Sequence, residues 1–329
     1  MDKQKRLLPA AFVFCLTAAV FRLQLGAVRL SPAQLWKALL EGPGNTAGYI
    51  FWYARLPRTA ACLLSGAALA VSGAVIQAVL SNKLASPGII GVNAGAGLAL
   101  TACCALGLLS GWVIALSAFG GAMISVLLVM FTAEKTGASR TTVILGGVAV
   151  NSFLNALSEA LTTLIPDAGV LSGDFRVGGF SSVVPVRLLP AGILICSALL
   201  VVLTLHNELD VLALGEETAQ SLGMSVKKTR TLFLVLSAML AGASVSFAGL
   251  LGFVGLIVPH AVRSLVGSES RNLLPLCAIG GAGFVTACDL VSRLLIIPYE
   301  LPVGILMSVL GGPFFLGLLL KRKGGRHHA

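Results

Sequence analysis

Long apolar runs with almost no charge are the feature that most limits how this chain can fold. We distinguish ten of them in the 329 residues, at 7–28, 56–81, 88–109, 112–133, 142–165, 187–205, 231–249, 251–266, 273–297 and 302–320. A transmembrane helix needs about 20 apolar residues, whereas a strand of a membrane barrel shows about ten alternating ones. Because these runs are continuous, the sequence predicts an all-α, polytopic membrane protein with about ten transmembrane helices.

Composition excludes the other classes of protein. Hydrophobic residues make up 57% of the chain and charged residues 11%, while an ordinary soluble domain carries about a quarter of charged residues. A disordered chain would have far less apolar mass. No low-complexity linker or soluble segment interrupts the pattern. We therefore expect residues 1–329 to form a single transmembrane domain.

The net charge of +10 would suggest a nucleic-acid partner in a soluble protein. Here the cations lie in short breaks between apolar runs, which favours the positive-inside rule over nucleic-acid binding. Ten spans place both termini on one side, and the basic residues predict that this side is the cytoplasm. The predicted inner side collects Lys3, Lys5, Arg6, Lys83, Lys135, Arg140, Lys227, Lys228, Arg230, Arg263, Arg271, Lys321, Arg322, Lys323 and Arg326, and the outer side Arg29, Lys37, Arg55, Arg58, Arg176, Arg187 and Arg293.

The first apolar run is interpreted as a membrane helix. A basic segment precedes it, as in a secretory signal peptide, but the run is long and no A-x-A-like cleavage site closes it.

The sequence offers no catalytic or metal-binding motif. It contains no G-x-x-x-x-G-K-[ST] loop, no H-E-x-x-H and no G-x-S-x-G. The four histidines, two of them the terminal pair His327-His328, are scattered, and the seven cysteines form no C-x-x-C. We expect a chain that is not an enzyme, that binds no metal or cofactor, and whose cysteines are small core residues.

Ionisable groups within the spans suggest function, because they are costly in hydrocarbon. Asn151, Asn155 and Glu159 follow one another at intervals of four and share a helix face. This face either lines an aqueous pathway or forms an interhelical hydrogen-bond cluster. Asp289 and Arg293 are also four residues apart, which predicts an ion pair at the outer end of the ninth span.

A stripe of small residues, Gly66, Ala70, Ala74 and Ala78, follows one face of the second span. Such stripes let helices approach closely. We favour packing within one subunit over a dimer interface.

Three connections between the spans are long. Residues 30–54 contain Ser31-Pro32, a helix-start signal. Residues 166–185 form a connection rich in Gly and Ser. The sequence pattern of residues 206–229 predicts two short helices, with breaks at Gly215 and Gly223. Leu212, Ala219 and Leu222 would form a small apolar face on them, bordered by Glu216, Glu217 and Gln220. This predicts a docking element for a cytoplasmic protein.

Arg55 and Arg58 flank Pro57 at the outer start of the second span. Two cations there oppose both the helix dipole and the positive-inside trend, so a partner should compensate them. Carboxylates of a docking protein would suit arginine well, and headgroup phosphates are the alternative.

Taken together, six stretches resemble the FecCD-type permease subunit of type II ABC importers. They are Arg55–Arg58; Ser65 to Gln77; Asn82 to Gly97, with the pattern N-x-L-A-x-P-G-x-x-G-V-x-x-G-A-G; Leu212 to Gly223; Gly252 to Arg263; and Leu301–Gly304 with Gly311–Phe315.

The resemblance implies an assembly in the bacterial cytoplasmic membrane. A second permease subunit, identical or paralogous, would complete the substrate path. Two ATPase subunits would bind ATP and Mg, and a periplasmic or lipid-anchored substrate-binding protein would dock outside. The residues that match family sites are Arg55, Arg58 and Arg293 for the binding protein; Leu212, Gly215, Glu216, Glu217, Gln220, Leu222 and Gly223 for ATPase coupling; and Asn82, Leu84, Arg140 and Thr141 for the inner gate.

The resemblance also implies the cargo, with a ferric siderophore as the first choice and haem or cobalamin as alternatives. Transport would proceed by alternating access. Two further hypotheses compete. An ion-coupled secondary transporter would use Glu159 or Asp289 as its titratable site. A membrane enzyme acting on lipid would need clustered Asp, His or metal ligands, which the sequence does not show.

Overall fold

The computed structural model describes residues 2–26, 28, 30–135, 140–181, 183–296 and 299–324, and within them the chain is helical with no strand. Arg29, Arg326 and the pair His327-His328 lie outside the described residues. The helices are α1 (Asp2–Gln24), α2 (Pro32–Glu41), α3 (Thr46–Tyr49), the π-helix η1 (Ile50–Arg55), α4 (Leu56–Val79), the 3-10 helix η2 (Pro87–Ile90), α5 (Val92–Ala105), α6 (Gly111–Lys135), α7 (Arg140–Leu164), α8 (Pro166–Val177), α9 (Pro185–Thr204), α10 (His206–Ala213), α11 (Glu216–Ser221), α12 (Val226–Ala248), α13 (Val254–Val266), α14 (Ser270–Leu294) and α15 (Val303–Gly324).

Each of the ten apolar runs corresponds to a helix. Six spans in the described part are long and apolar enough to cross a bilayer, and the bent pair α9–α10, with an angle of 61°, makes a seventh. The shorter apolar helices α5, α13 and α15 account for the remaining runs. The prediction of a polytopic helical membrane protein is confirmed, and the count of ten holds if the short helices are included.

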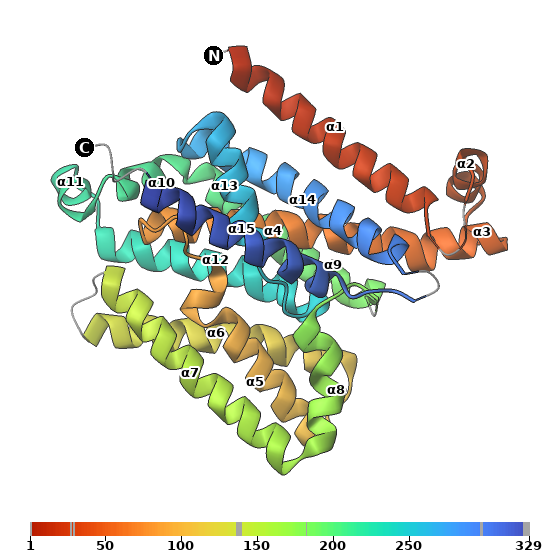
Figure 1. Cartoon of the computed structure of the whole chain (residues 1–329), viewed down its shortest axis with the longest axis horizontal. Coiled ribbons are helices and arrows are strands. Elements are labelled where there is room, and N and C mark those ends of the chain that lie inside the picture. The colour runs from red at the N-terminus through yellow and green to blue at the C-terminus, as the bar shows by residue number, and fades with distance from the viewer. Residues whose placement is uncertain are drawn as a thin grey trace.

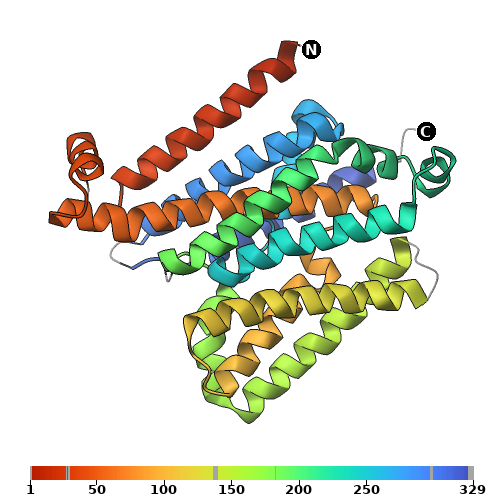
Figure 2. The same ribbon diagram turned by 180° about the vertical axis from the view of Figure 1, so that it is seen from behind.

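Helices α4 and α12 form the centre of the molecule, and α9, α13 and α14 pack around them (Figures 1 and 2). Small residues let these helices touch through their backbones. A methyl group on Gly66 would overlap the carbonyl of Gly281 on α14, and one on Gly73 would overlap Gly255 on α13. The small stripe of α4 therefore packs within one subunit, at least at Gly66 and Ala70, as the sequence favoured.

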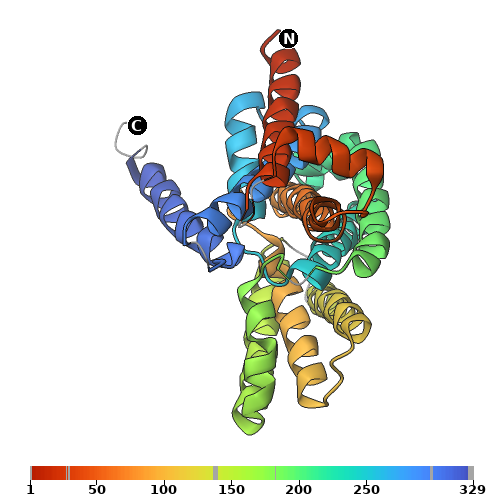
Figure 3. The ribbon, with the colours of Figure 1, turned by 90° about the vertical axis from the view of Figure 1, so that its right-hand side faces the viewer.

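Helices α5 to α8 form a second group below the central one (Figures 1 and 3). Gly95 and Gly121 bring α5 and α6 together in the same way. The connection 166–185 contains a helix: residues 166–177 form α8, which begins with Pro166 in its first turn and is capped by Gly178. Pro166 is preset for a helix start, and this outweighs the Gly and Ser content of the segment.

The molecule has two distinct ends, one carrying α2 and α3 and the other α10 and α11 (Figure 1). The helix start predicted at Ser31 is confirmed, since Ser31 and Gln34 form a reciprocal capping box on α2. The two short helices predicted in 206–229 are also present, and Gly215 and Gly223, both with positive φ, separate and end them.

Candidate functional site

At the α2–α3 end, charged side chains from three parts of the chain form a network that we call the outer charge cluster: Arg22, Arg55, Arg58, Asp289, Arg293 and Glu300. Arg22 and Asp289 are both fully buried, and Nη2 of Arg22 lies 2.7 Å from Oδ2 of Asp289. Arg58 lies 3.0 Å from the other oxygen of Asp289 and 2.6 Å from Glu300. The cluster thereby joins α1, α4 and α14.

Asp289 and Arg293 do not form the ion pair that their spacing predicted. Asp289 pairs with Arg22 and Arg58, and the Nε of Arg293 instead lies 3.2 Å from Glu300. Arg22, from a helix far away in sequence, supplies the stronger partner, because a buried carboxylate needs a buried cation. Sequence spacing captures local pairs only, so it could not show this contact.

Arg55 lies at the end of η1 and is 4% exposed. Its guanidinium donates to the backbone carbonyls of Leu23 and Val28. A π-helix inserts extra backbone and is often found at functional positions. Arg55 thus lies against the last turn of α1 and the segment that follows it.

The cluster holds four arginines against two carboxylates, which leaves two positive charges in excess. Arg55, Arg58, Arg293 and Glu300 line a pocket of about 330 Å³ together with Tyr53 and Phe180. The three arginines that the sequence assigned to docking thus gather in one place. They are compensated in part by Asp289 and Glu300, whereas the sequence had suggested an internal partner for Arg293 alone.

Glu300 is the carboxylate of this cluster that lies outside the spans. Burial alone would raise its pKa, but the hydrogen bond and charge of Arg58, with the charge of Arg293, outweigh burial and lower the pKa of Glu300 below its ordinary value. Glu300 is therefore ionised over the neutral range and bridges Arg58 to Arg293.

At the opposite end, α10 and α11 carry the predicted coupling residues. Leu212 and Ala219 are fully buried against the bundle, while Leu222 is 64% exposed. The prediction that these three residues share one apolar face is therefore wrong. Leu214 and Leu222 are the exposed apolar residues of this segment instead, because the bend at Gly215 turns α11 relative to α10.

The acidic residues of α11 differ from each other. Glu216 lies 2.9 Å from Arg230 at the start of α12, whereas Glu217 is exposed and makes no side-chain ion pair with a described residue. Gln220 is exposed beside them. Glu216 thus fixes α11 to the bundle, and Glu217 faces outward.

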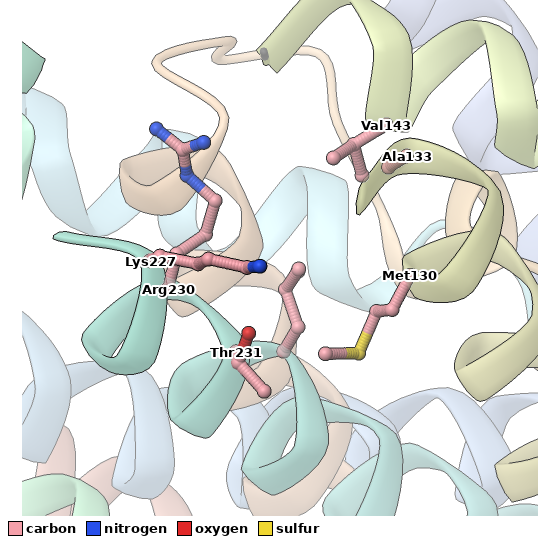
Figure 4. Close-up of a pocket in the computed structure, with 7 residues that line it drawn as sticks. Met130, Ala133, Val143, Lys227, Arg230 and Thr231 are labelled. Atoms are coloured by element: carbon pink, nitrogen blue, oxygen red, sulfur yellow. The ribbon is translucent and has the colours of Figure 1, made fainter. Parts of the chain in front are cut away.

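Two of the predicted inner-gate residues lie at the first turn of α7. Nη2 of Arg140 donates to the carbonyl of Leu212 on α10, at 3.0 Å, and Thr141 is exposed. Arg140 therefore connects the start of α7 to the short helices. Figure 4 shows a small pocket between α6, α7 and α12, with both apolar and basic side chains in its wall. Its lining residues are Met130, Ala133, Val143, Lys227, Arg230, Thr231 and Leu234.

The other two predicted gate residues lie in the turn after α4. The side chain of Asn82 accepts a hydrogen bond from the backbone N–H of Leu84. Both residues are half-buried. Asn82 and Leu84 are thus held by local turn geometry, and their contacts do not reach Arg140.

The three polar residues of α7 separate in the structure. Asn151 donates to the carbonyls of Gly88 and Ile89 on η2, at 2.8 and 3.2 Å, so it has the interhelical role that the sequence left open. Asn155 and Glu159 are exposed on the surface of the single subunit. A charged residue exposed on a membrane helix requires water or a protein partner there.

A cavity of about 610 Å³ opens between α5, α8 and α15. Its wall is partly apolar, through Val177, Leu250, Ile305 and Val309, and partly polar, through Asn93, Arg176 and Ser308. The sequence placed Arg176 among the outer cations and gave it no further role. The sequence showed only a connection rich in Gly and Ser here, so it did not reveal that Arg176 lies in the last turn of a helix, α8.

The described residues hold no group of three or more His, Cys, Asp or Glu side chains placed to bind a metal ion. The three features that stand out are therefore the outer charge cluster, the exposed short helices and the partly polar cavity. Together with the helical fold, they describe a polytopic membrane protein with a charged outer end, a protruding segment at the opposite end and a partly polar cavity.

Comparison with known proteins gives the family. The model of the FecCD transport family matches residues 12–321. The vitamin B12 import system permease protein BtuC of Salmonella typhimurium is 40% identical over 293 residues, covering 84% of this chain and 86% of that protein. The same-named protein of Citrobacter koseri is 36% identical over 334 residues, covering 97% and 95%.

A solved structure, described as an inward-facing conformation of a metal-chelate type ABC transporter, superimposes with a TM-score of 0.86 at 28% identity. It covers 96% of this chain and 99% of that one. The chain belongs to the FecCD transport family. It is a permease of the type II ABC importer class, as the sequence motifs predicted, and a multi-pass protein of the inner membrane.

Proposed function

We propose that this chain is the permease subunit of an ATP-driven importer that moves a bulky metal chelate into the cytoplasm by alternating access. The α10–α11 unit is the observation that carries this proposal. It protrudes at one end of the bundle and presents Leu214, Leu222 and Glu217 to a partner. Exposed apolar side chains beside a carboxylate fit a protein docking surface.

The partner at this end is an ATPase pair, which would hold ATP and Mg. This proposal orients the α10–α11 end toward the cytoplasm, together with both termini. A second permease subunit, identical or paralogous, covers the exposed polar face of α7. In this scheme the permease subunit itself needs no cofactor, because it guides the cargo and transmits the motion of the ATPase pair.

The outer charge cluster is the proposed docking site of a substrate-binding protein. Its two excess positive charges favour carboxylates on the incoming protein. Arg58 and Arg293 line the open pocket and are suited to contact. Arg55 shapes the pocket, since its guanidinium is occupied by backbone carbonyls.

Cobalamin is the proposed cargo, because relatives that are 36–40% identical are named vitamin B12 permeases. A ferric siderophore, the first choice from the sequence, is the second candidate. The likeness to a metal-chelate type transporter favours it. Haem is the remaining member of this chemical class.

An uptake experiment tests the proposal. A strain lacking this gene receives labelled cobalamin, labelled ferric siderophore and labelled haem in parallel. We expect loss of cobalamin uptake, restored by the wild-type gene. Loss of the siderophore signal alone would replace cobalamin by the second candidate. Unchanged uptake of all three, in a strain without a second importer of this family, would contradict the proposed class of cargo.

A further inference from the structure

Arg176 is the charged residue that the functions above leave unexplained. It lines the 610 Å³ cavity from the last turn of α8. Nη2 donates to the hydroxyls of Thr101 and Ser158, and Nε is buried without a hydrogen-bond partner. No described carboxylate lies within ion-pair distance of this side chain. Arg176 is thus a cation solvated by two neutral hydroxyls.

A cation in this position is costly unless water or an anion meets it. Isolated charges are expensive in an apolar environment, and arginine within a membrane protein faces a partner or a wet cavity. The carboxyl end of α8 offers a partial negative charge, but this effect is weak beside a full counter-charge. Elsewhere in the same fold, in the outer charge cluster, the buried Arg22 forms an ion pair with Asp289.

The backbone around Arg176 is fixed. The carbonyl of Phe175 accepts from Leu250, and that of Gly178 accepts from Gly304 at the start of α15. A methyl group on Gly304 would overlap the carbonyl of Val177. The end of α8, the loop after α12 and the start of α15 are therefore held in direct contact. The cavity wall that presents Arg176 is preformed.

The remaining wall suits a large ligand with one anionic group. The amide of Asn93 lines the cavity and makes no hydrogen bond with a described residue, and Ser308 adds a hydroxyl. Val177, Ile305 and Val309 supply apolar surface. A few polar groups within an apolar wall are typical of a ligand site.

We infer that Arg176 forms an anion-recognition subsite in the translocation pathway, which contacts a carboxylate or phosphodiester group of the cargo as it passes. This inference rests on the proposed function, because it takes the cavity to be part of the path. Arginine binds such groups bidentately. The hydroxyls of Thr101 and Ser158 keep the guanidinium in place while the pathway is empty.

A labelling experiment tests the subsite without transport. Val309→Cys places a thiol on the cavity wall, in a chain whose exposed Cys196 is replaced by alanine. The full-length protein in lipid nanodiscs reacts with a negatively charged sulfonate methanethiosulfonate and, separately, with a positively charged trimethylammonium one. Arg176→Gln should lower the ratio of anionic to cationic labelling rates roughly tenfold, because one positive charge is removed nearby.

Controls separate charge from disruption. Arg176→Lys should keep the ratio, and Arg271→Gln, an exposed arginine at the start of α14, should leave it unchanged. An unchanged ratio in Arg176→Gln would overturn the inference. So would failure of both reagents to label Val309→Cys, which would mark a dry, lipid-facing surface.

Lipid phosphate shares this chemistry, so the nanodiscs are made with and without phosphatidylglycerol. A ratio that stays high in both supports a site kept for cargo. If the ratio of anionic to cationic labelling rates falls when phosphatidylglycerol is present, the site binds a lipid headgroup, and the inference is overturned.

An uptake experiment then tests the cargo. Cobalamin carries a phosphodiester, whereas cobinamide lacks it. Arg176→Gln should slow cobalamin uptake about tenfold more than cobinamide uptake, and equal slowing would overturn the anion role. If the wild-type protein moves neither compound, the proposed cargo fails, and the labelling experiment still decides the subsite.

Discussion

The two ends of the bundle use charge in opposite ways. At the α2–α3 end, Asp289 and Glu300 pair with arginines of the same chain, and Arg22 and Asp289 are fully buried. At the α10–α11 end, Glu217 and the apolar Leu222 are exposed. Charge buried within one chain holds helices together, whereas charge on a protruding segment remains free for a partner. The α2–α3 end is therefore braced by ion pairs and keeps two positive charges in excess, whereas the α10–α11 end, the proposed receiving end for the ATPase pair, exposes a carboxylate beside apolar side chains.

Breaking the buried pair should have the largest effect. Asp289→Asn leaves Arg22 buried without its counter-charge, which costs about 3–5 kcal/mol when one member of a buried pair is removed. We expect a sharp loss of folded protein, measured by thermal unfolding in detergent. Asp167→Asn, the same change at an exposed position in the first turn of α8, is the matched control. Equal stability of the two variants would show that the outer cluster does not brace the fold.

Charge reversal at the receiving end should disturb function and not folding. Glu217→Lys places a cation on the exposed face of α11, and we expect uptake to fall about tenfold as ATPase docking weakens. Thermal stability should stay unchanged. Glu41→Lys, on exposed α2 at the other end, is the control. Normal uptake in Glu217→Lys would count against the docking assignment. Glu216→Lys is less clean, because Glu216 also pairs with Arg230.

Arg140 should have an intermediate effect, because it connects the receiving end to α7. Arg140→Gln weakens a hydrogen bond from a charged group to the carbonyl of Leu212, an interaction worth about 1.5–3 kcal/mol. We expect ATP hydrolysis to continue while uptake per ATP falls. Arg140→Lys should restore part of the coupling. A parallel fall of hydrolysis and uptake would instead indicate that docking itself was lost.

Glu300 should give the smallest effect. Its pKa is lowered in the folded protein, so its contribution to stability is present above the ordinary carboxyl pKa and is lost as the pH falls through the folded value. The contribution is below about 1 kcal/mol, because Glu300 is 41% exposed. The wild-type protein should lose this increment below about pH 4.5, whereas Glu300→Gln should show a flatter profile. Identical pH profiles of thermal unfolding would show that Glu300 does not stabilise the cluster.

The sequence predicted most of the fold because hydrophobic length is a local property. The ten apolar runs, the capped start at Ser31 and the breaks at Gly215 and Gly223 all depend on neighbouring residues. The site was predicted less completely. The pairing of Arg22 with Asp289 and the burial of Leu212 depend on helices distant in sequence. Motif resemblance placed Arg55, Arg58 and Arg293 in one group, but only the structure shows that Glu300 joins two of them.

The backbone contacts between Gly178 and Gly304 have a consequence for how such a chain can diversify. These contacts set the backbone outline of the cavity, and none of them is made by a side chain that lines it. Positions 93, 176, 308 and 309 can therefore be exchanged while the outline persists. Under the proposed function, a gene duplicate would need few substitutions at those positions to accept a chelate of different charge, and new cargo preferences would arise on an unaltered scaffold.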